Sequence, residues 1–393
     1  MFRKTIFWIH LSCGVLAGLL VFVMSLTGVL LAYERQIKGW VAQSHYVPAA
    51  QQTTRLPLLQ LLADFKLARP ELQPNSLSVN NNPGAPVSVR AGRAGSFDLD
   101  PYTAQIMQTE SAELNEFFET VEHVHRWLNL SGESRNTARA VMDAANAIFL
   151  FLVLSGLYLW LPPLWKQALF KARLWLRTDY TSSKVRDFHW HHVFGIWMAL
   201  PLLAVVYTGA VMTYPWAANL LYRAFGAEIP APPSGPGGPP PGFGGGPNPF
   251  AAANGGAASE GQNDSLTVDA LLQAALADAN SAGWKRVTLS LPAANDKTVR
   301  IEIDQGNGAQ AHLRHTLILD RSSGDIKQVR EFGDTPKAQR LRGIARFLHT
   351  GEVLGFWGQT LAALASTAAM LLVWTGLSLA WRRLIQPLFN RKA

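Results

Sequence analysis

The sequence contains almost no cysteine: among 393 residues, Cys13 is the only one. A single thiol excludes an intramolecular disulfide, although a compartment outside the cytoplasm would permit one. The chain also lacks the glycine-rich fingerprint of a nucleotide site and a P-loop. These absences exclude a disulfide-stabilised domain and a protein that binds a nucleotide through either of these glycine-rich loops.

Charge is absent from four long stretches of the sequence. No Asp, Glu, Lys or Arg occurs between Lys4 and Glu34, from Ala144 to Trp165, from Phe188 to Tyr222, or from Val353 to Trp381. Each stretch supplies the roughly 20 apolar residues that cross a ~30 Å hydrocarbon core. The first is too long for the apolar region of a signal peptide and has no clear cleavage site. The sequence therefore predicts a mainly α membrane protein with a bundle of four transmembrane helices.

Positive charges predict the orientation of these helices. Lys and Arg cluster before the first stretch, in the loop 166–187, and after the fourth stretch. Because short loops rich in Lys and Arg stay in the cytoplasm, both termini and this loop are expected there. The net charge of +8 is mostly this bias, and no stripe suited to nucleic acid is present. A bacterial inner membrane, with the two long connections in the periplasm, fits this pattern.

The second half of the chain repeats the first. His10 is followed by Gly14 after four residues and by Thr27 after 17, and His191 is followed by Gly195 and Thr208 at the same spacings. After each of these spans come a helical segment and short alternating strands, which predict a small α+β module. The pattern indicates a parallel duplication about an axis along the membrane normal.

The expected organisation follows from this repeat. It comprises transmembrane helix 1 in 1–35, module 1 in 36–115, a His-bearing segment with helix 2 in 116–165, the basic loop 166–187, helix 3 in 188–222, a Pro/Gly-rich linker in 223–264, module 2 in 265–335, and a His-bearing segment with helix 4 and a basic tail in 336–393.

The repeat also arranges four histidines in two pairs. His10 and His191 begin spans one and three, whereas His125 and His349 precede spans two and four on the opposite side. Two imidazoles converging in an apolar bundle suit the axial positions of a haem iron and favour electron transfer. Zinc would require further Cys or carboxylate ligands, which the neighbouring sequence does not supply. We therefore expect two haem b groups, one for each pair.

Residues near the four histidines have further expected roles. Gly14 and Gly195, one turn beyond their histidines, would leave room for the flat macrocycle. His189 and His192 are alternatives to His191, with His189 the reserve ligand, and His123 is a weaker alternative to His125.

Polar residues around the histidines leave two interpretations open. Arg126, Arg342 and Arg346 either neutralise haem propionates or attract an anionic substrate, or they are solvated interface anchors. Ser/Thr-Gly pairs at 27–28, 155–156, 208–209 and 375–376 are expected to be points where helices pack closely.

Four segments together resemble a known family. They are "HLSCGVLAGLLVFVMSLTGVLLAYE", "HRWLNL", "DFHWHHVFGIWMALPLLAVVYTGAVMTYP" and "FLHTGEVLGFWGQTLAALASTAAMLLVWTGLSLAWRR". They are similar to the PepSY-associated transmembrane proteins, a family of iron-regulated bacterial inner-membrane proteins. The resemblance implies four helices, two b-type haems on His10, His125, His191 and His349, and PepSY-like periplasmic modules. The crowded "HWHH" motif and the long Gly/Pro insertion depart from the family pattern.

The function implied by the resemblance is reduction of a ferric siderophore in the periplasm, which releases iron. The expected partners are the ferric siderophore, membrane lipid and a separate electron donor, either a quinol or a cytoplasmic reductase. Two other functions remain open at the level of sequence. One is a b-type cytochrome that passes electrons to another protein without a chelate site of its own, and the other is a non-redox regulator that binds a periplasmic peptidase through PepSY-like modules.

Overall fold

The computed structural model describes residues 1–45, 54–107, 111–162, 167–229, 266–293 and 296–390. Most of the Pro/Gly-rich linker expected in 223–264 lies outside these ranges. The chain forms two compact units, each described by itself. The helical unit comprises Met1–Arg35, Glu113–Phe243 and Leu341–Ala393, and the sheet unit comprises Gln36–Ala112 and Gly244–Arg340.

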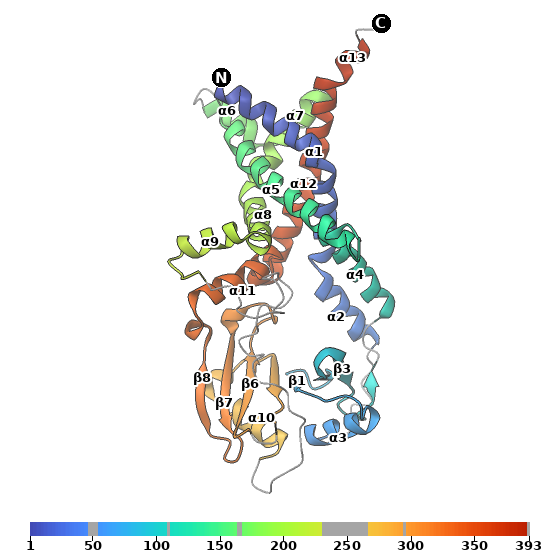
Figure 1. Ribbon diagram of the computed structural model, residues 1–393, viewed down its shortest axis with the longest axis vertical. Coiled ribbons are helices and arrows are strands. Elements are labelled where there is room, and N and C mark those ends of the chain that lie inside the picture. Colours follow the sequence, from blue (N-terminus) through green and yellow to red (C-terminus); the bar gives the residue numbers. More distant parts are fainter. Residues whose placement is uncertain (46–53, 108–110, 163–166, 230–265, 294–295, 391–393) are drawn as a thin grey trace. The chain divides into compact units, whose positions relative to one another are not determined.

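Long apolar helices build the helical unit (Figure 1). Three of them are long and apolar enough to cross a membrane: α1 (Phe2–Leu31), α5 (Ser134–Trp160) and α12 (Gly355–Leu384). The third expected span is instead a pair, α7 (Ser183–Trp197) and α8 (Ala199–Thr213), bent by 67°. The described residues therefore contain three membrane-length helices, or four if the bent pair counts as one span.

A proline explains the bend between α7 and α8. Pro201 has no N–H to donate to the carbonyl of Trp197, and its ring would clash with that carbonyl in a continuous helix. The helix therefore ends at Trp197 and restarts at Ala199. Such a kink is tolerated at membrane depth because neighbouring helices cover the interrupted backbone.

The helices of this unit pack through small residues. Helix α1 packs against α5 and α12, α7 packs against α12, and α5 packs against α8. At the contact of α8 and α12, Leu202 lies against Ala365 and Ala369. Large side chains such as Leu16 and Trp374 stay exposed. Both features suit helices surrounded by lipid, where close backbone approach replaces an apolar driving force.

Shorter helices complete the described helical segments outside the sheet. They are α2 (Glu34–His45), α4 (Ala112–Trp127), α6 (Gln167–Leu174), α9 (Pro215–Ala224), α11 (Lys337–His349) and α13 (Gln386–Asn390). After α11, Gly351 takes a positive φ of 76°, and a side chain there would collide with the backbone of Gly358. This close approach fixes the turn that joins α11 to α12 and so places His349.

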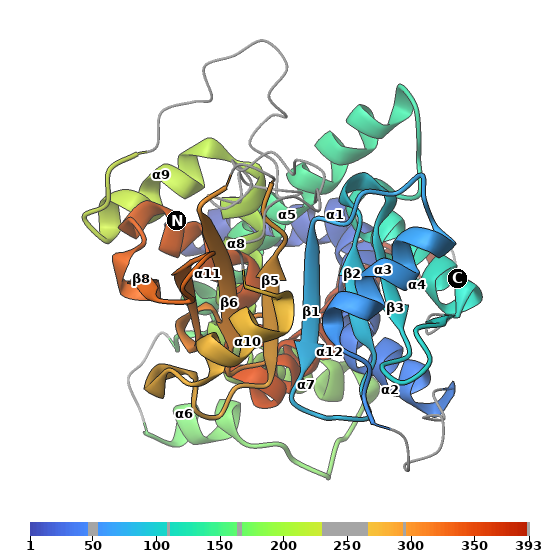
Figure 2. The same cartoon turned by 90° about the horizontal axis from the view of Figure 1, so that it is seen from below.

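The strands of the sheet unit form one antiparallel sheet with the order β4-β3-β2-β1-β5-β6-β7-β8 (Figure 2). They are β1 (Ser76–Asn80), β2 (Val87–Arg90), β3 (Ser96–Leu99), β4 (Ile106–Met107), β5 (Arg286–Ser290), β6 (Thr298–Asp304), β7 (Arg314–Asp320) and β8 (Ile326–Arg330). The first strands of the two repeats pair with each other, so that Leu77 lies opposite Leu289. The sequence predicted two modules but not this joining edge.

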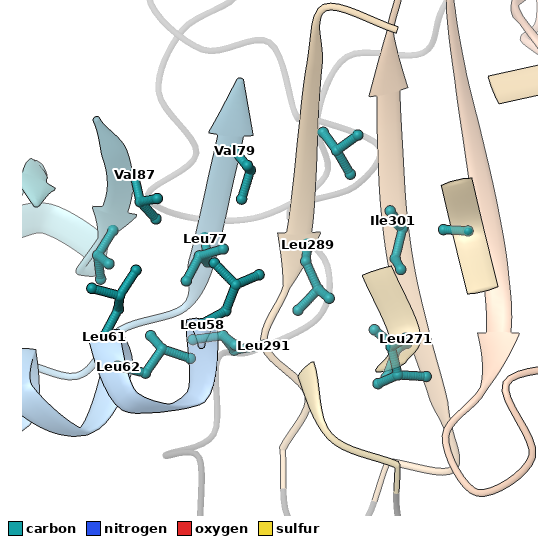
Figure 3. Close-up of a cluster of buried hydrophobic side chains, with 14 of the residues drawn as sticks. Leu58, Leu61, Leu62, Leu77, Val79, Val87, Leu271, Leu289, Leu291 and Ile301 are labelled. Atoms are coloured by element: carbon teal, nitrogen blue, oxygen red, sulfur yellow. The ribbon is translucent and has the colours of Figure 1, made fainter. Parts of the chain in front are cut away.

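One hydrophobic core serves both repeats in this sheet. Helices α3 (Leu58–Ala68) and α10 (Val268–Leu276) cover the same face, and Leu61, Leu77, Leu271 and Leu289 belong to a single buried cluster (Figure 3). The carboxylate of Asp269 in α10 accepts hydrogen bonds from the backbone N–H groups of Leu58 and Leu59, which start α3. Strand pairing, core packing and a helix cap therefore all link the two repeats.

Candidate functional site

The helical unit places the four predicted histidines at two levels, with two histidines at each. His10 and His191 lie in α1 and α7, near the end of the bundle that holds both chain termini, and we call them the termini-side pair. His125 and His349 lie in the last turns of α4 and α11, and we call them the far-side pair. The two levels are set by helix geometry, because Thr27, which contacts His125, follows His10 by 17 residues, or roughly 25 Å of α-helix.

Each imidazole uses its Nδ1 atom in a hydrogen bond to a different helix. In three cases the partner is a hydroxyl oxygen: His10 Nδ1 lies 2.8 Å from Ser155 Oγ, His191 Nδ1 lies 2.9 Å from Thr375 Oγ1, and His125 Nδ1 lies 2.8 Å from Thr27 Oγ1. His349 Nδ1 lies 2.8 Å from the carbonyl oxygen of Val205 and 3.4 Å from Thr208 Oγ1. Each histidine therefore bonds to a span of its own repeat.

The hydroxyl groups determine which nitrogen of each ring carries the proton. Ser155, Thr27 and Thr375 each donate their hydroxyl proton to a carbonyl in the preceding turn, at 2.7 Å in every case. A hydroxyl has one proton to donate, so its oxygen accepts the proton of Nδ1–H. The Val205 carbonyl also only accepts. All four rings therefore have a protonated Nδ1 and a free lone pair on Nε2, which is the form in which Nε2 binds a metal.

A glycine follows each of the four hydroxyl residues and borders the same ring. A Cβ atom built on it would meet imidazole Cε1 at 3.3 Å for Gly376 and His191, 3.4 Å for Gly209 and His349, 3.5 Å for Gly156 and His10, and 3.7 Å for Gly28 and His125. The Ser/Thr-Gly pairs were expected only as places where helices pack closely. The structure adds a specific contact, because each pair holds one histidine by a hydrogen bond and leaves space for its ring.

The far-side rings lie close to each other. Their centroids are 6.4 Å apart and their planes are inclined by 64°. Because metal–nitrogen bonds to imidazole are about 2.1 Å long, two rings at this separation are close enough to bind one metal ion between them. Burial lowers the pKa of His125 to about 4; the neighbouring His349 lowers it further, and a hydrogen bond to the Met24 carbonyl raises it. Burial also lowers the pKa of His349. Both rings are therefore neutral at pH 7, as metal ligands must be.

The other histidines near the pairs have different contacts. Nδ1 of His189 lies 3.0 Å from the hydroxyl of Tyr180, and Nδ1 of His192 lies 2.9 Å from the Phe188 carbonyl of its own helix. His123 packs edge-on against Trp127 at 5.1 Å between centroids. Within the "HWHH" motif, His191 is the histidine whose Nδ1 bonds to a Ser/Thr-Gly pair, through Thr375.

The arginines proposed near the far-side pair are held along their own helices. Arg126 forms an ion pair of 2.7 Å with Glu122 and lies over the ring of Trp127. Arg346 is exposed and lies 5.8 Å from the ring centre of Phe347. These contacts give Arg126 a structural role in α4, and they leave Arg346 the more accessible of the two to an anionic ligand.

The two predicted spacer glycines differ in their surroundings. No atom of the described chain other than the local helix backbone lies within 4 Å of a Cβ built on Gly14, whereas one on Gly195 would meet a methyl group of Leu372 at 3.7 Å. Gly14 therefore borders open space, as a spacer for a flat ring would require. Gly195 has a side-chain neighbour at ordinary contact distance.

Two polar residues beside the far-side pair were missed in the sequence. A Cβ on Gly209 would lie 3.2 Å from Asn146 Nδ2, and a Cβ on Gly28 would lie 3.5 Å from Ser366 Oγ. Each side chain approaches from the opposite repeat. The sequence contained one indication of these residues, their equivalent positions in the repeat. Asn146 precedes Ser155 by nine residues, and Ser366 precedes Thr375 by the same number.

The donor atoms fit one type of metal group better than others. No group of three or more His, Cys, Asp or Glu side chains suited to a metal ion occurs among the described residues, which leaves no complete donor set for zinc there. Paired neutral imidazoles with free Nε2 atoms are instead the donor set of a bis-histidine haem.

Comparison with known proteins agrees with the membrane architecture. No curated protein matches the chain. The family described as "PepSY-associated TM region" matches residues 7–383, which is nearly the whole sequence and includes all four histidines. The chain is therefore a membrane protein that belongs to the PepSY-associated transmembrane family.

Proposed function

We propose that this protein is a di-haem b oxidoreductase of the bacterial inner membrane that reduces a ferric siderophore in the periplasm. The observation that carries the proposal is the far-side histidine pair, with ring centroids 6.4 Å apart and each Nδ1 already bonded. The repeat supplies an equivalent pair, His10 and His191, at the other level. When bound, the haems supply one-electron carriers at two depths of the membrane.

The residues of the chain have separate tasks in this proposal. The four histidines present Nε2 as the ligand atom. Hydroxyls of the Ser/Thr-Gly pairs hold three of the rings, and the Val205 carbonyl holds His349. Gly14 leaves space beside the termini-side level. Arg346, exposed near His349, is suited to attract an anionic ligand toward the far-side level.

The reaction needs one electron for each iron released. Reduction converts Fe(III) to Fe(II), and hard oxygen donors bind Fe(II) much less well, so that the metal leaves the chelate. A quinol gives two electrons and two protons on oxidation to a quinone, and one quinol would therefore serve two ferric chelates. A cytoplasmic reductase docking on the basic loop is the other candidate donor.

A spectrum of the purified full-length protein tests the proposal directly. Protein from haem-replete cells is expected to show a Soret band and two low-spin haems per chain, because each histidine pair would supply two imidazole ligands to one haem. A colourless protein would exclude haem function and would favour a non-redox PepSY-type regulator.

The substrate is tested separately from the cofactor. Dithionite-reduced protein, freed of excess reductant, is mixed with a ferric hydroxamate or a ferric catecholate, and haem reoxidation is followed together with trapping of Fe(II) by a ferrous chelator. Rapid reoxidation with matching Fe(II) formation is expected. Two stable haems that neither chelate reoxidises would indicate a cytochrome whose partner is another protein.

A further inference from the structure

The two far-side histidines differ in the group that accepts the hydrogen bond from Nδ1–H. His125 directs Nδ1–H to the hydroxyl of Thr27 at 2.8 Å. His349 directs Nδ1–H to the carbonyl of Val205 at 2.8 Å, and its equivalent hydroxyl, Thr208 Oγ1, is 3.4 Å away. The two rings therefore differ in their hydroxyl contact. Thr27 lies close to His125, with the Met24 carbonyl as a further acceptor, whereas Thr208 lies farther from His349 and the Val205 carbonyl is its short contact.

We propose that Thr27, Thr375 and Ser155 are positioning residues that set the reduction potentials of the bound haems, whereas Thr208 is not. This inference rests on the proposed function, because it concerns how the same histidines act toward a haem. A hydrogen bond from Nδ1–H to an acceptor increases the electron donation of the ring through Nε2. Greater donation stabilises Fe(III) over Fe(II) and lowers the reduction potential.

The repeated geometry carries the inference beyond one contact. Three hydroxyl groups on three different helices, α1, α5 and α12, each donate to their own helix and accept from a histidine. A hydroxyl that served helix packing alone would need only the first of these bonds. Thr367 in α12 shows that simpler case, since its hydroxyl donates to the Ala363 carbonyl at 2.9 Å and no histidine bond to it is found among the described residues.

The experiment compares four variants of the full-length, haem-loaded protein by optical redox titration. Thr27→Val is expected to raise the midpoint potential of one haem and leave the other unchanged. Thr27→Ser, which keeps the hydroxyl, is expected to restore the wild-type value. Thr208→Val should shift the same haem much less, because the Val205 carbonyl still holds His349. Thr367→Val is the matched control and should shift neither.

Each result decides a different question. A wild-type protein without haem overturns the proposed function on which the inference depends. If the wild type holds two haems and Thr27→Val has the same midpoint potentials as Thr367→Val, the inference is overturned but the proposed function is not. A shift in Thr208→Val as large as that in Thr27→Val also overturns it. If Thr27→Val loses the haem, Thr27→Ser must retain it at the wild-type potential, and loss from both would contradict a role for the hydroxyl.

Discussion

A hydroxyl group with one proton to donate decides the state of the histidine beside it. In this protein, three hydroxyls give that proton to their own helix, so that the oxygen accepts from Nδ1. Buried polar groups in a membrane are costly unless they are bonded, and this arrangement bonds both partners. The imidazole is therefore held in its tautomer by the span against which it packs.

The glycine after each hydroxyl is expected to be as important as the hydroxyl itself. In Gly376→Ala, the new methyl group would lie 3.3 Å from Cε1 of His191, which is tighter than most contacts of this kind, and the ring must move. We expect partial or complete loss of one haem, measured as the haem-to-protein ratio and the Soret absorbance. Overpacking of this kind costs about 1–3 kcal/mol.

A second glycine provides the control for that variant. Gly343 in α11 has no neighbour within 4 Å of a built Cβ among the described residues outside its own helix backbone. Gly343→Ala should therefore keep both haems and, with a residue of higher helix propensity, lose no stability. Equal haem content in Gly376→Ala and Gly343→Ala would show that the ring tolerates the methyl group.

At the residue scale, the sequence identified the histidines but not the hydroxyl groups to which they bond. The spacing from His10 to Thr27, repeated from His191 to Thr208, was visible in the chain and identified both residues as parts of a repeat. It did not tell which hydroxyl meets which ring, because Thr27 bonds to His125 and Ser155 bonds to His10. That pairing depends on how α1, α4 and α5 pack, which no local pattern encodes.

At the scale of elements, periodicity predicted the helices and strands better than their connections. The charge-free stretches correspond to α1, α5, α7 with α8, and α12, but the bend in the third span was missed even though Pro201 marks it. The short alternating strands expected in module 2 are present as β5, β6 and β7. Pairing of β1 with β5 was not, since strand alternation shows which face is buried but not which edge has a partner.

The cap on α3 provides a test of the coupling between the two repeats. Asp269→Ala removes the acceptor of the Leu58 and Leu59 N–H groups, and the loss of an N-terminal cap typically costs about 1 kcal/mol. We expect faster hydrogen–deuterium exchange in residues 58–68, although the mutation lies in the other repeat. Asp278→Ala removes a bond to the Asn280 N–H instead, and should leave exchange in α3 unchanged. Unaltered exchange of α3 in Asp269→Ala would contradict the cap.

At the scale of the whole chain, the single cysteine allows the proposed orientation to be measured. In a Cys13→Ser background, Thr181→Cys and Gln328→Cys place one exposed thiol before α7 and one in β8. The positive-inside rule predicts that a membrane-impermeant maleimide added to intact cells, with the outer membrane permeabilised, labels residue 328 and not residue 181. Labelling of residue 181 alone would place the far-side histidines at the cytoplasmic face.

The two levels of histidines also predict that the haems can be removed one at a time. His349→Ala deletes a ligand of the far-side pair, whereas His191→Ala deletes one of the termini-side pair, and the levels are separated by roughly 25 Å of helix. Each variant should retain one low-spin haem. His123→Ala, in the same helix as His125 but packed on Trp127, should retain both haems.

With the orientation above, His349→Ala should lose ferric chelate reduction with the physiological donor. His191→Ala should lose it with that donor but keep it when an artificial reductant is supplied outside. Two haems in His349→Ala, or reduction by it at the wild-type rate with the physiological donor, would contradict a far-side exit for electrons.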